Sequence, residues 1–337
     1  MIKITMCNTL NATKKIQPVY SYILRDYFYR YLAGDIVLRE GRTVSRRQFI
    51  MAKSGIKNPD SIAIGVVAAT QRFSDAVALL CHNPKIDMAL LCEVNSLLRE
   101  RTTRLPVIRS NPLQLQSACG LYQHDCPAPS LSLKITQQAL SEFENTTATI
   151  EQLMALMASI INAHPFSDGN GRTTRAIFEA VCNAKQYPHL SPYIFVLTNN
   201  NMDELLSFHR SLCNDKFQVR GQKFLDNFLA WNVLFQQKLN TLLHETTAKI
   251  SSKMLLMQTG NWFRPLLTSF WQNPIISVKS ITTKTGDIAD AKQGLDTLLT
   301  QRVLTLHTIA NELCFVAEDI LSLHEAIEAM LFANDNN

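Results

Sequence analysis

The sequence contains little glycine and proline, with 11 glycines and 12 prolines among 337 residues. An all-β protein of this length would need many tight turns, and tight turns depend on these two residues. The sequence also has no apolar run close to the roughly 20 residues that a membrane-spanning helix needs, so we expect no membrane segment. The shortage of glycine and proline therefore argues against an all-β fold and favours a mainly α-helical protein.

Cysteine pairs and a signal sequence are missing as well. The eight cysteines include no CxxC pair, which argues against a zinc site and for reduced thiols. The first residues, MIKITMCNTLNATKKIQ, lack the apolar run and cleavage site of a secretory signal, so we expect a cytoplasmic protein. The net charge of +5 is spread along the chain and does not predict binding to nucleic acid.

What the sequence does contain is helical periodicity. Apolar residues recur with the spacing of one buried helical face between Thr149 and Asn162, and Pro165 disfavours helix in the residue before it. A second helix is predicted from Asn170 to Lys185, so the polar segment HPFSDG becomes a short connecting loop. Residues 105–135 break the pattern and predict a hairpin, and residues 222–257 are helical again.

The last part of the chain has a different order of predicted helices and strands. The helix-like segment NWFRPLLTSFW is followed by two short helical stretches separated at Gly286 and then by a β-rich segment. This order resembles a winged helix-turn-helix.

The loop and the start of the second helix carry the residues of a phosphate site. Gly169, Asn170 and Gly171 begin a helix, where backbone N–H groups and the positive end of the helix dipole bind anions. Arg172 and Arg175 are three residues apart in the first turns and could hold a phosphate tail with charge-assisted hydrogen bonds.

Two more residues complete the predicted site. Asp168 supplies the one carboxylate that, with phosphate oxygens, usually holds Mg²⁺. His164, at the other end of the loop, can act as a general base near neutral pH. Each residue alone has an ordinary structural explanation, since DGNG strings are common turns. A turn does not require the histidine and both arginines, so the combination predicts phosphoryl or nucleotidyl transfer to a hydroxyl group.

The segment HPFSDGNGRTTR resembles the signature of the Fic family, HPFxDGNGR followed by a second arginine, at every specified position. The resemblance implies a protein adenylyltransferase that uses ATP and Mg²⁺ (or Mn²⁺) to attach AMP to a Ser, Thr or Tyr hydroxyl. It implies that His164 is the base, that Asp168 binds the metal, and that Gly169 through Arg172 hold the α- and β-phosphates. Doc-like kinases of the family carry lysine at the second glycine, so Gly171 favours AMP transfer.

The resemblance extends to the segment before the motif. VIRSNP places Arg109 at the arginine that precedes the family's hairpin, or flap. The flap normally aligns a target peptide by main-chain pairing, so residues 111–121 are expected to dock the protein substrate. After the motif, Asn214 is the candidate for the family's adenine-contacting asparagine, although no tyrosine accompanies it.

Many Fic proteins also carry an inhibitory segment, Ser/Thr-xxx-Glu-Gly/Asn, whose glutamate pairs with the second arginine. Residues 36–41, IVLREG, supply Glu40 and Gly41, whereas residues 61–66, SIAIGV, supply only the serine. We prefer Glu40 as an off-switch acting on Arg175. The ordinary alternative is an exposed glutamate that ends a helix before Gly41.

The resulting prediction is a Fic-type helical core with a small β-hairpin flap and a C-terminal winged helix-turn-helix. Its parts are residues 1–95 with the inhibitory segment, 96–250 as the Fic core, and 260–337 as the winged helix. Two alternative functions stay open: a hydrolase that removes AMP with help from Glu40, and a DNA-binding regulator. Three aspartates and one lysine on the predicted recognition helix argue against DNA. The sequence leaves a homodimer open.

Overall fold

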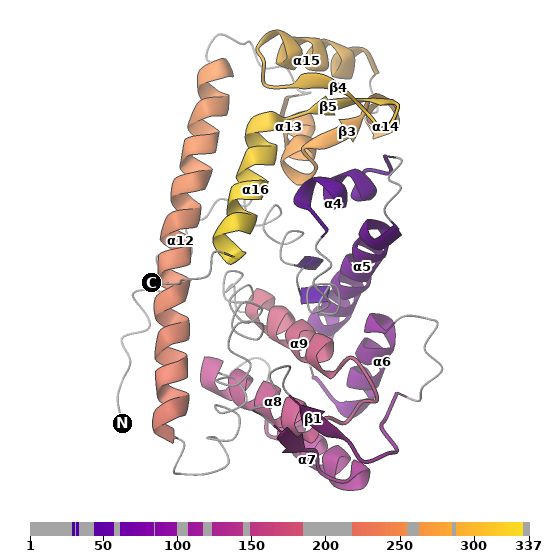
Figure 1. The fold of residues 1–337 in the computed structure, drawn as a ribbon, viewed down its shortest axis with the longest axis vertical. Coiled ribbons are helices and arrows are strands. Elements are labelled where there is room, and N and C mark those ends of the chain that lie inside the picture. Colours follow the sequence, from indigo (N-terminus) through magenta and orange to yellow (C-terminus); the bar gives the residue numbers. More distant parts are fainter. Residues whose placement is uncertain are drawn as a thin grey trace. The chain divides into compact units, whose positions relative to one another are not determined.

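A computed structural model of the chain describes residues 29–30, 32–33, 44–56, 61–83, 85–99, 107–116, 123–143, 149–184, 218–254, 263–284 and 288–332. These residues are mostly helical, which confirms the predicted fold class, and they belong to two compact units (Figure 1). The first unit takes its described residues from 27–35 and 69–234, and the second from 36–68 and 235–337. Two helices, α5 (Ser61–His82) and α12 (Gln218–Met254), contribute to both.

The first unit is built around two helices joined by the HPFSDG loop. Helix α8 (Ile150–Ala163) packs against α7 (Pro129–Ser141) and α9 (Asn170–Ala184), and α9 also packs against α6 (Met88–Leu98). Both helices predicted beside the loop are confirmed. Helix α9 lies deep in the core, because every residue from Thr173 to Cys182 is buried.

The boundaries of α8 follow from its sequence. Thr149 caps its start in a capping box with Gln152, in which each side chain binds the other residue's backbone N–H. Leu153, Leu156 and Ile160 then form the predicted buried face, with exposures of 3% or less. The helix ends at His164, which adopts a left-handed conformation.

A short antiparallel hairpin precedes α7. Strand β1 (Gln114–Gln116) pairs with β2 (Gln123–Asp125), with Leu115 opposite His124. The backbone N–H of Cys126 donates to the carbonyl of Leu113 at 3.0 Å and extends the pairing by one step. The paired ends of the predicted flap are therefore confirmed, and residues 117–122 lie outside the described residues.

The second unit contains α13 (Phe263–Gln272), β3 (Ile275–Ser277), α14 (Val278–Lys284), α15 (Ile288–Thr300), β4 (Thr305–Ile309), β5 (Glu312–Val316) and α16 (Glu318–Phe332). Its three strands form an antiparallel sheet in the order β3-β5-β4. The two helical stretches and the following strands agree with the elements expected from the sequence. The assignment of this unit as a winged helix-turn-helix stays a prediction, as does the division at residues 95, 250 and 260.

Helix α4 (Arg46–Lys53) is part of the second unit although it lies far from it in sequence. Ile50 and Ile56 join a buried cluster with β3, β5 and α16 residues Ile275, Cys314, Val316 and Leu321. The Arg46 side chain donates to Nδ1 of the fully buried His324 on α16, at 3.2 Å from Nε and 2.9 Å from a terminal nitrogen. Burial first, and then the charge of Arg46, hold the pKa of His324 well below its ordinary value.

Helix α5 is long and apolar enough to cross a membrane, although the sequence led us to expect no such segment. Its length and composition would allow a membrane span, with a mean hydropathy of 1.3 in its most apolar window. One such helix is weak evidence, because the core helix of a soluble protein meets the same criterion. Phe73, Ala76 and Leu80 are fully buried, and the Phe73 ring lies 5.3 Å from that of Tyr29. The Phe73, Ala76 and Leu80 side chains of α5 therefore belong to the core of the first unit.

The buried histidine predicts a pH dependence of the second unit's stability. An unfolded histidine titrates near 6.5, whereas folded His324 has a lowered pKa, so below about pH 6.5 the unfolded chain binds a proton that the folded unit does not. The free energy of unfolding should fall as pH decreases through this range, by at most about 1.4 kcal/mol per pH unit. Above it, His324 should contribute no slope.

Hydrogen exchange of α16 amides between pH 5 and 7, corrected for intrinsic rates, measures this slope. His324→Asn supplies a side-chain acceptor for Arg46 that does not titrate, so this variant should lose the pH slope of α16 opening. The matched control is His82→Asn at an exposed histidine of α5. A slope that persists in His324→Asn would contradict the assignment.

Candidate functional site

The loop that joins α8 to α9 begins at His164 and ends at Gly169. His164 has φ 52° and ψ 59°, and its backbone N–H closes α8 by donating to Ile160 at 2.8 Å. Its Nδ1 lies 3.2 Å from the carbonyl oxygen of Ile161. A carbonyl can only accept, so Nδ1 is the donor in this hydrogen bond, and a neutral His164 ring in this pose would carry its lone pair on Nε2. In that form the half-buried imidazole could act as a base through Nε2.

The middle of the loop is held by main-chain pairing. Arg109 N–H donates to Pro165 at 2.9 Å, Ser167 N–H donates to Val107 at 3.1 Å, and Ile108 and Phe166 form an antiparallel bridge. The Phe166 side chain is fully buried, as expected for an anchor without a chemical role.

Asn170 fixes the loop to the start of α9. Its Oδ1 accepts from the Phe166 N–H at 3.0 Å, and its Nδ2 donates to the Phe166 carbonyl at 2.8 Å. Both ends of the Asn170 amide therefore hold the loop. Any contribution of Asn170 to the predicted phosphate cradle would come from its backbone N–H.

Asp168 is the accessible carboxylate of the loop. Its Oδ1 accepts from the Gly169 N–H at 2.6 Å, and its Oδ2 forms an ion pair with Arg172 at 2.7 Å. The Asp168 side chain is 43% exposed, whereas that of Arg172 is 10% exposed. The carboxylate can thus be reached from solvent, while the guanidinium also donates to the Leu98 carbonyl at 3.0 Å.

The two predicted phosphate-binding arginines bind different parts of the protein. Arg172 binds Asp168 and the end of α6, whereas Nε of the buried Arg175 donates to the Leu32 carbonyl at 3.0 Å. Both guanidinium groups thus bind protein oxygens. The i, i+3 spacing places them near each other along α9, but α9 is buried on several sides and each side chain contacts a different neighbour.

Asn95 of α6 supports the loop and was not found by sequence reasoning. Its side chain is fully buried, and Nδ2 donates to the Asp168 carbonyl at 2.9 Å and to Thr173 Oγ1 at 3.1 Å. It also contacts the place where a Cβ on Gly169 would lie, at 2.9 Å from Nδ2. The available signal was a polar residue on the apolar face formed by Leu91, Val94 and Leu98.

Some of the predicted site residues lie outside the part of the chain that the structure describes, and others can be placed. Glu40 and Asn214 lie outside the described residues, as do positions 117–121 of the predicted docking flap. Gly171 is in the first turn of α9 and is half-buried. Arg109 is buried beside the C-terminal end of α8.

The loop offers a single carboxylate to a metal ion. Within the described ranges, no group of three or more His, Cys, Asp or Glu side chains could hold a metal. Asp168 can nevertheless fit Mg²⁺ in the manner typical of nucleotide enzymes, in which one carboxylate acts together with substrate phosphates and water. The residues present therefore suit a metal that arrives with a nucleotide.

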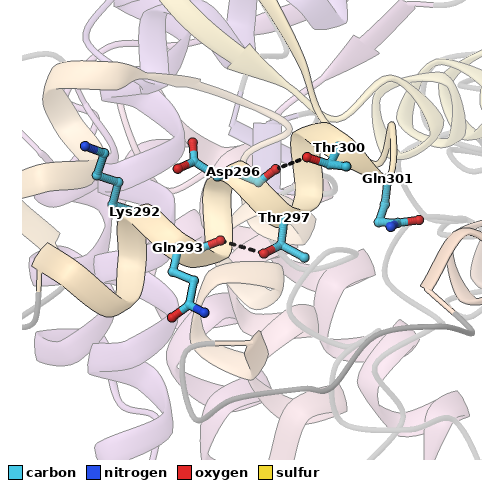
Figure 2. A pocket seen from close by; sticks show the side chains of 6 residues that line it. All are labelled: Lys292, Gln293, Asp296, Thr297, Thr300 and Gln301. Carbon is cyan, nitrogen blue, oxygen red and sulfur yellow. Dashed lines mark hydrogen bonds between the residues drawn. The ribbon is translucent and has the colours of Figure 1, made fainter.

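The second unit has a separate groove of about 530 Å³ along α15, lined by Lys292, Gln293, Asp296, Thr297, Thr300 and Gln301 (Figure 2). Two of its hydroxyls bind carbonyls one turn earlier, Thr297 to Gln293 at 2.6 Å and Thr300 to Asp296 at 2.8 Å. The groove carries one lysine and one aspartate, so its net charge is not that of a phosphate-binding surface.

Comparisons with known proteins relate the chain to one family. The model of the Fic/DOC family matches residues 85–182, which include α6, the hairpin and the HPFSDG loop. A Fic-domain-containing signaling protein from Bacteroides thetaiotaomicron has 14% identity and a TM-score of 0.52, covering 67% of this chain and 92% of that chain. A Fic family protein from Desulfovibrio desulfuricans has 15% identity, a TM-score of 0.48 and 90% coverage of both chains. No curated protein matches the sequence.

The loop geometry predicts opposite effects for two Gly→Ala substitutions. Gly169 has φ +80°, and an added Cβ would lie 2.9 Å from Asn95, so Gly169→Ala should lower the free energy of unfolding by at least about 1–2 kcal/mol. Gly65 lies in α5 with nothing within 4 Å of an added Cβ, so Gly65→Ala should raise it by about 0.5–1 kcal/mol. Urea denaturation measures both. Equal shifts would contradict a strained turn at Gly169.

Proposed function

We propose that this member of the Fic/DOC family transfers AMP from MgATP to a Ser, Thr or Tyr hydroxyl of a protein. The observation that carries the proposal is the arrangement of one short loop. An imidazole whose Nδ1 lies 3.2 Å from the Ile161 carbonyl stands at the start of the loop, and the N-terminus of a buried helix stands at its end. A base and an anion site on one rigid loop are what nucleotidyl transfer to a hydroxyl requires.

The reaction assigns one task to each end of the loop. The acceptor hydroxyl oxygen attacks the α-phosphorus, a new O–P bond forms, and the bond to the β-phosphate oxygen breaks, releasing pyrophosphate. The hydroxyl proton passes to Nε2 of His164. The backbone N–H groups of Asn170, Gly171 and Arg172, at the start of α9, bind phosphate oxygens as negative charge builds up on them.

Asp168 is the residue that would hold Mg²⁺. The ion would neutralise phosphate charge in the transition state. Arg172 would bind phosphate oxygens from the opposite direction, since its guanidinium is anchored to the Leu98 carbonyl and already faces Asp168. The protein acceptor would lie along the hairpin, where an exposed strand can pair with an extended peptide. Gly171, with no side chain beside the phosphates, supports AMP transfer rather than kinase chemistry.

Replacing the base should separate chemistry from nucleotide binding. His164→Ala should reduce the rate of AMP transfer by about 10²–10⁴-fold, the usual contribution of a general base, while the Kd for ATP stays within about twofold. Self-modification with ATP labelled at the α-phosphate measures the rate, and calorimetry measures binding. His82→Ala, at an exposed histidine, is the control and should leave both unchanged. Loss of ATP binding in His164→Ala would indicate a structural histidine instead.

We also propose that Glu40 restrains the site through Arg175. A carboxylate on Arg175 would occupy donors that the nucleotide needs. Glu40→Gly should therefore increase self-modification in the same assay, and the control Glu93→Gln, on α6, should not. An unchanged rate in Glu40→Gly would contradict the switch but leave the transferase proposal intact.

A further inference from the structure

Arg109 makes an unusual set of contacts for a buried charged residue. It is 5% exposed, and its guanidinium donates to four backbone carbonyls. Two belong to the end of α8: Nε donates to His164 at 2.9 Å, and a terminal nitrogen donates to Ala163 at 3.3 Å. The other two flank the hairpin: Asn111, just before β1, accepts at 2.8 Å, and Pro127, just after β2, accepts at 2.7 Å.

The two contacts at the end of α8 place a positive charge at the negative end of the helix dipole. The last carbonyls of a helix lack intrahelical partners and form the negative end of its dipole. The last turn of α8 contains no basic residue, so the guanidinium of Arg109 supplies the positive charge from outside the helix. It does so at His164, whose left-handed backbone is unfavourable for a residue with a side chain and persists only when its surroundings hold it.

We infer that Arg109 is the positioning residue that holds the His164 imidazole and the two ends of the hairpin in a fixed relation. The inference rests on the proposed function, in which His164 is the base and the hairpin docks the acceptor. One rigid group with donors in a fixed fork then sets the distance between the proton acceptor and the incoming hydroxyl. Lysine cannot replace it, because one ammonium with three donors cannot reach four carbonyls on three segments.

The test compares Arg109→Lys with Ser132→Ala. Ser132 is fully buried, and its Oγ donates to the same Ala163 carbonyl at 2.5 Å, so it shares one of the four Arg109 acceptors. Arg109→Lys should lower kcat for self-modification by about 10–100-fold, as expected for a misplaced catalytic group, while the Kd for ATP stays within about twofold. Ser132→Ala should change kcat less than about threefold. Equal losses in the two variants, or an unchanged kcat in Arg109→Lys, would overturn the inference.

A second measurement does not depend on activity or on the variant's folding. In the unmodified protein, the Cys126 N–H donates to the Leu113 carbonyl at the base of the hairpin. The Ser167 N–H, in the loop between α8 and α9, donates to the Val107 carbonyl. Native-state hydrogen exchange should give both amides the same opening free energy if one group holds both segments. Amides that open independently would overturn the inference. Absence of any AMP adduct with wild-type protein would instead overturn the proposed function, and the exchange result would still show whether the hairpin base and the loop open together.

Discussion

The site depends on one backbone constraint: two buried helices, α8 and α9, must be joined by a loop of a few residues. Such a loop leaves little freedom, and the chain turns through left-handed conformations at both of its ends, His164 and Gly169. The left-handed conformation at His164 ends α8, and Nδ1 of its ring lies 3.2 Å from the carbonyl of Ile161. The same constraint that joins the helices therefore orients the His164 imidazole.

The loop is stabilised mainly by contacts with backbone atoms. The Asn170 amide, the Asn95 amide and the Arg109 guanidinium all bind main-chain groups, and the segment around Ile108 pairs with the loop like a strand. Backbone partners fix position without depending on the identity of the side chains at Ser167 or Pro165. The chain resembles the fold of the Bacteroides thetaiotaomicron structure although only 14% of the sequence is identical.

Sequence reasoning found the local features and missed the distant ones. The apolar period and the His164–Pro165 step predicted the end of α8 within one residue, because both act within a few residues. The partners of Asn95 and the two α8 carbonyls bound by Arg109 lie more than 50 residues away along the chain, and no short pattern encodes such a pairing. The pairing of Arg46 with His324 spans an even longer stretch of the chain, so the inclusion of α4 in the second unit could not be read from periodicity either.

The arginines of α9 show why the protein partners of a side chain cannot be predicted from its spacing along a helix. Spacing along a helix fixes the direction of a side chain relative to its neighbours, but the partner depends on what packs against that face. Asp168 and Arg172 now bind each other, and each is the predicted partner of an oppositely charged ligand. A phosphate alone would meet the repulsion of Asp168, and a cation alone would meet that of Arg172. Under the proposed function, a metal and a triphosphate that arrived together would replace both halves of the ion pair at once, and two new charge pairs would offset the desolvation cost of separating it. The ion pair would then favour the metal–nucleotide complex over either component.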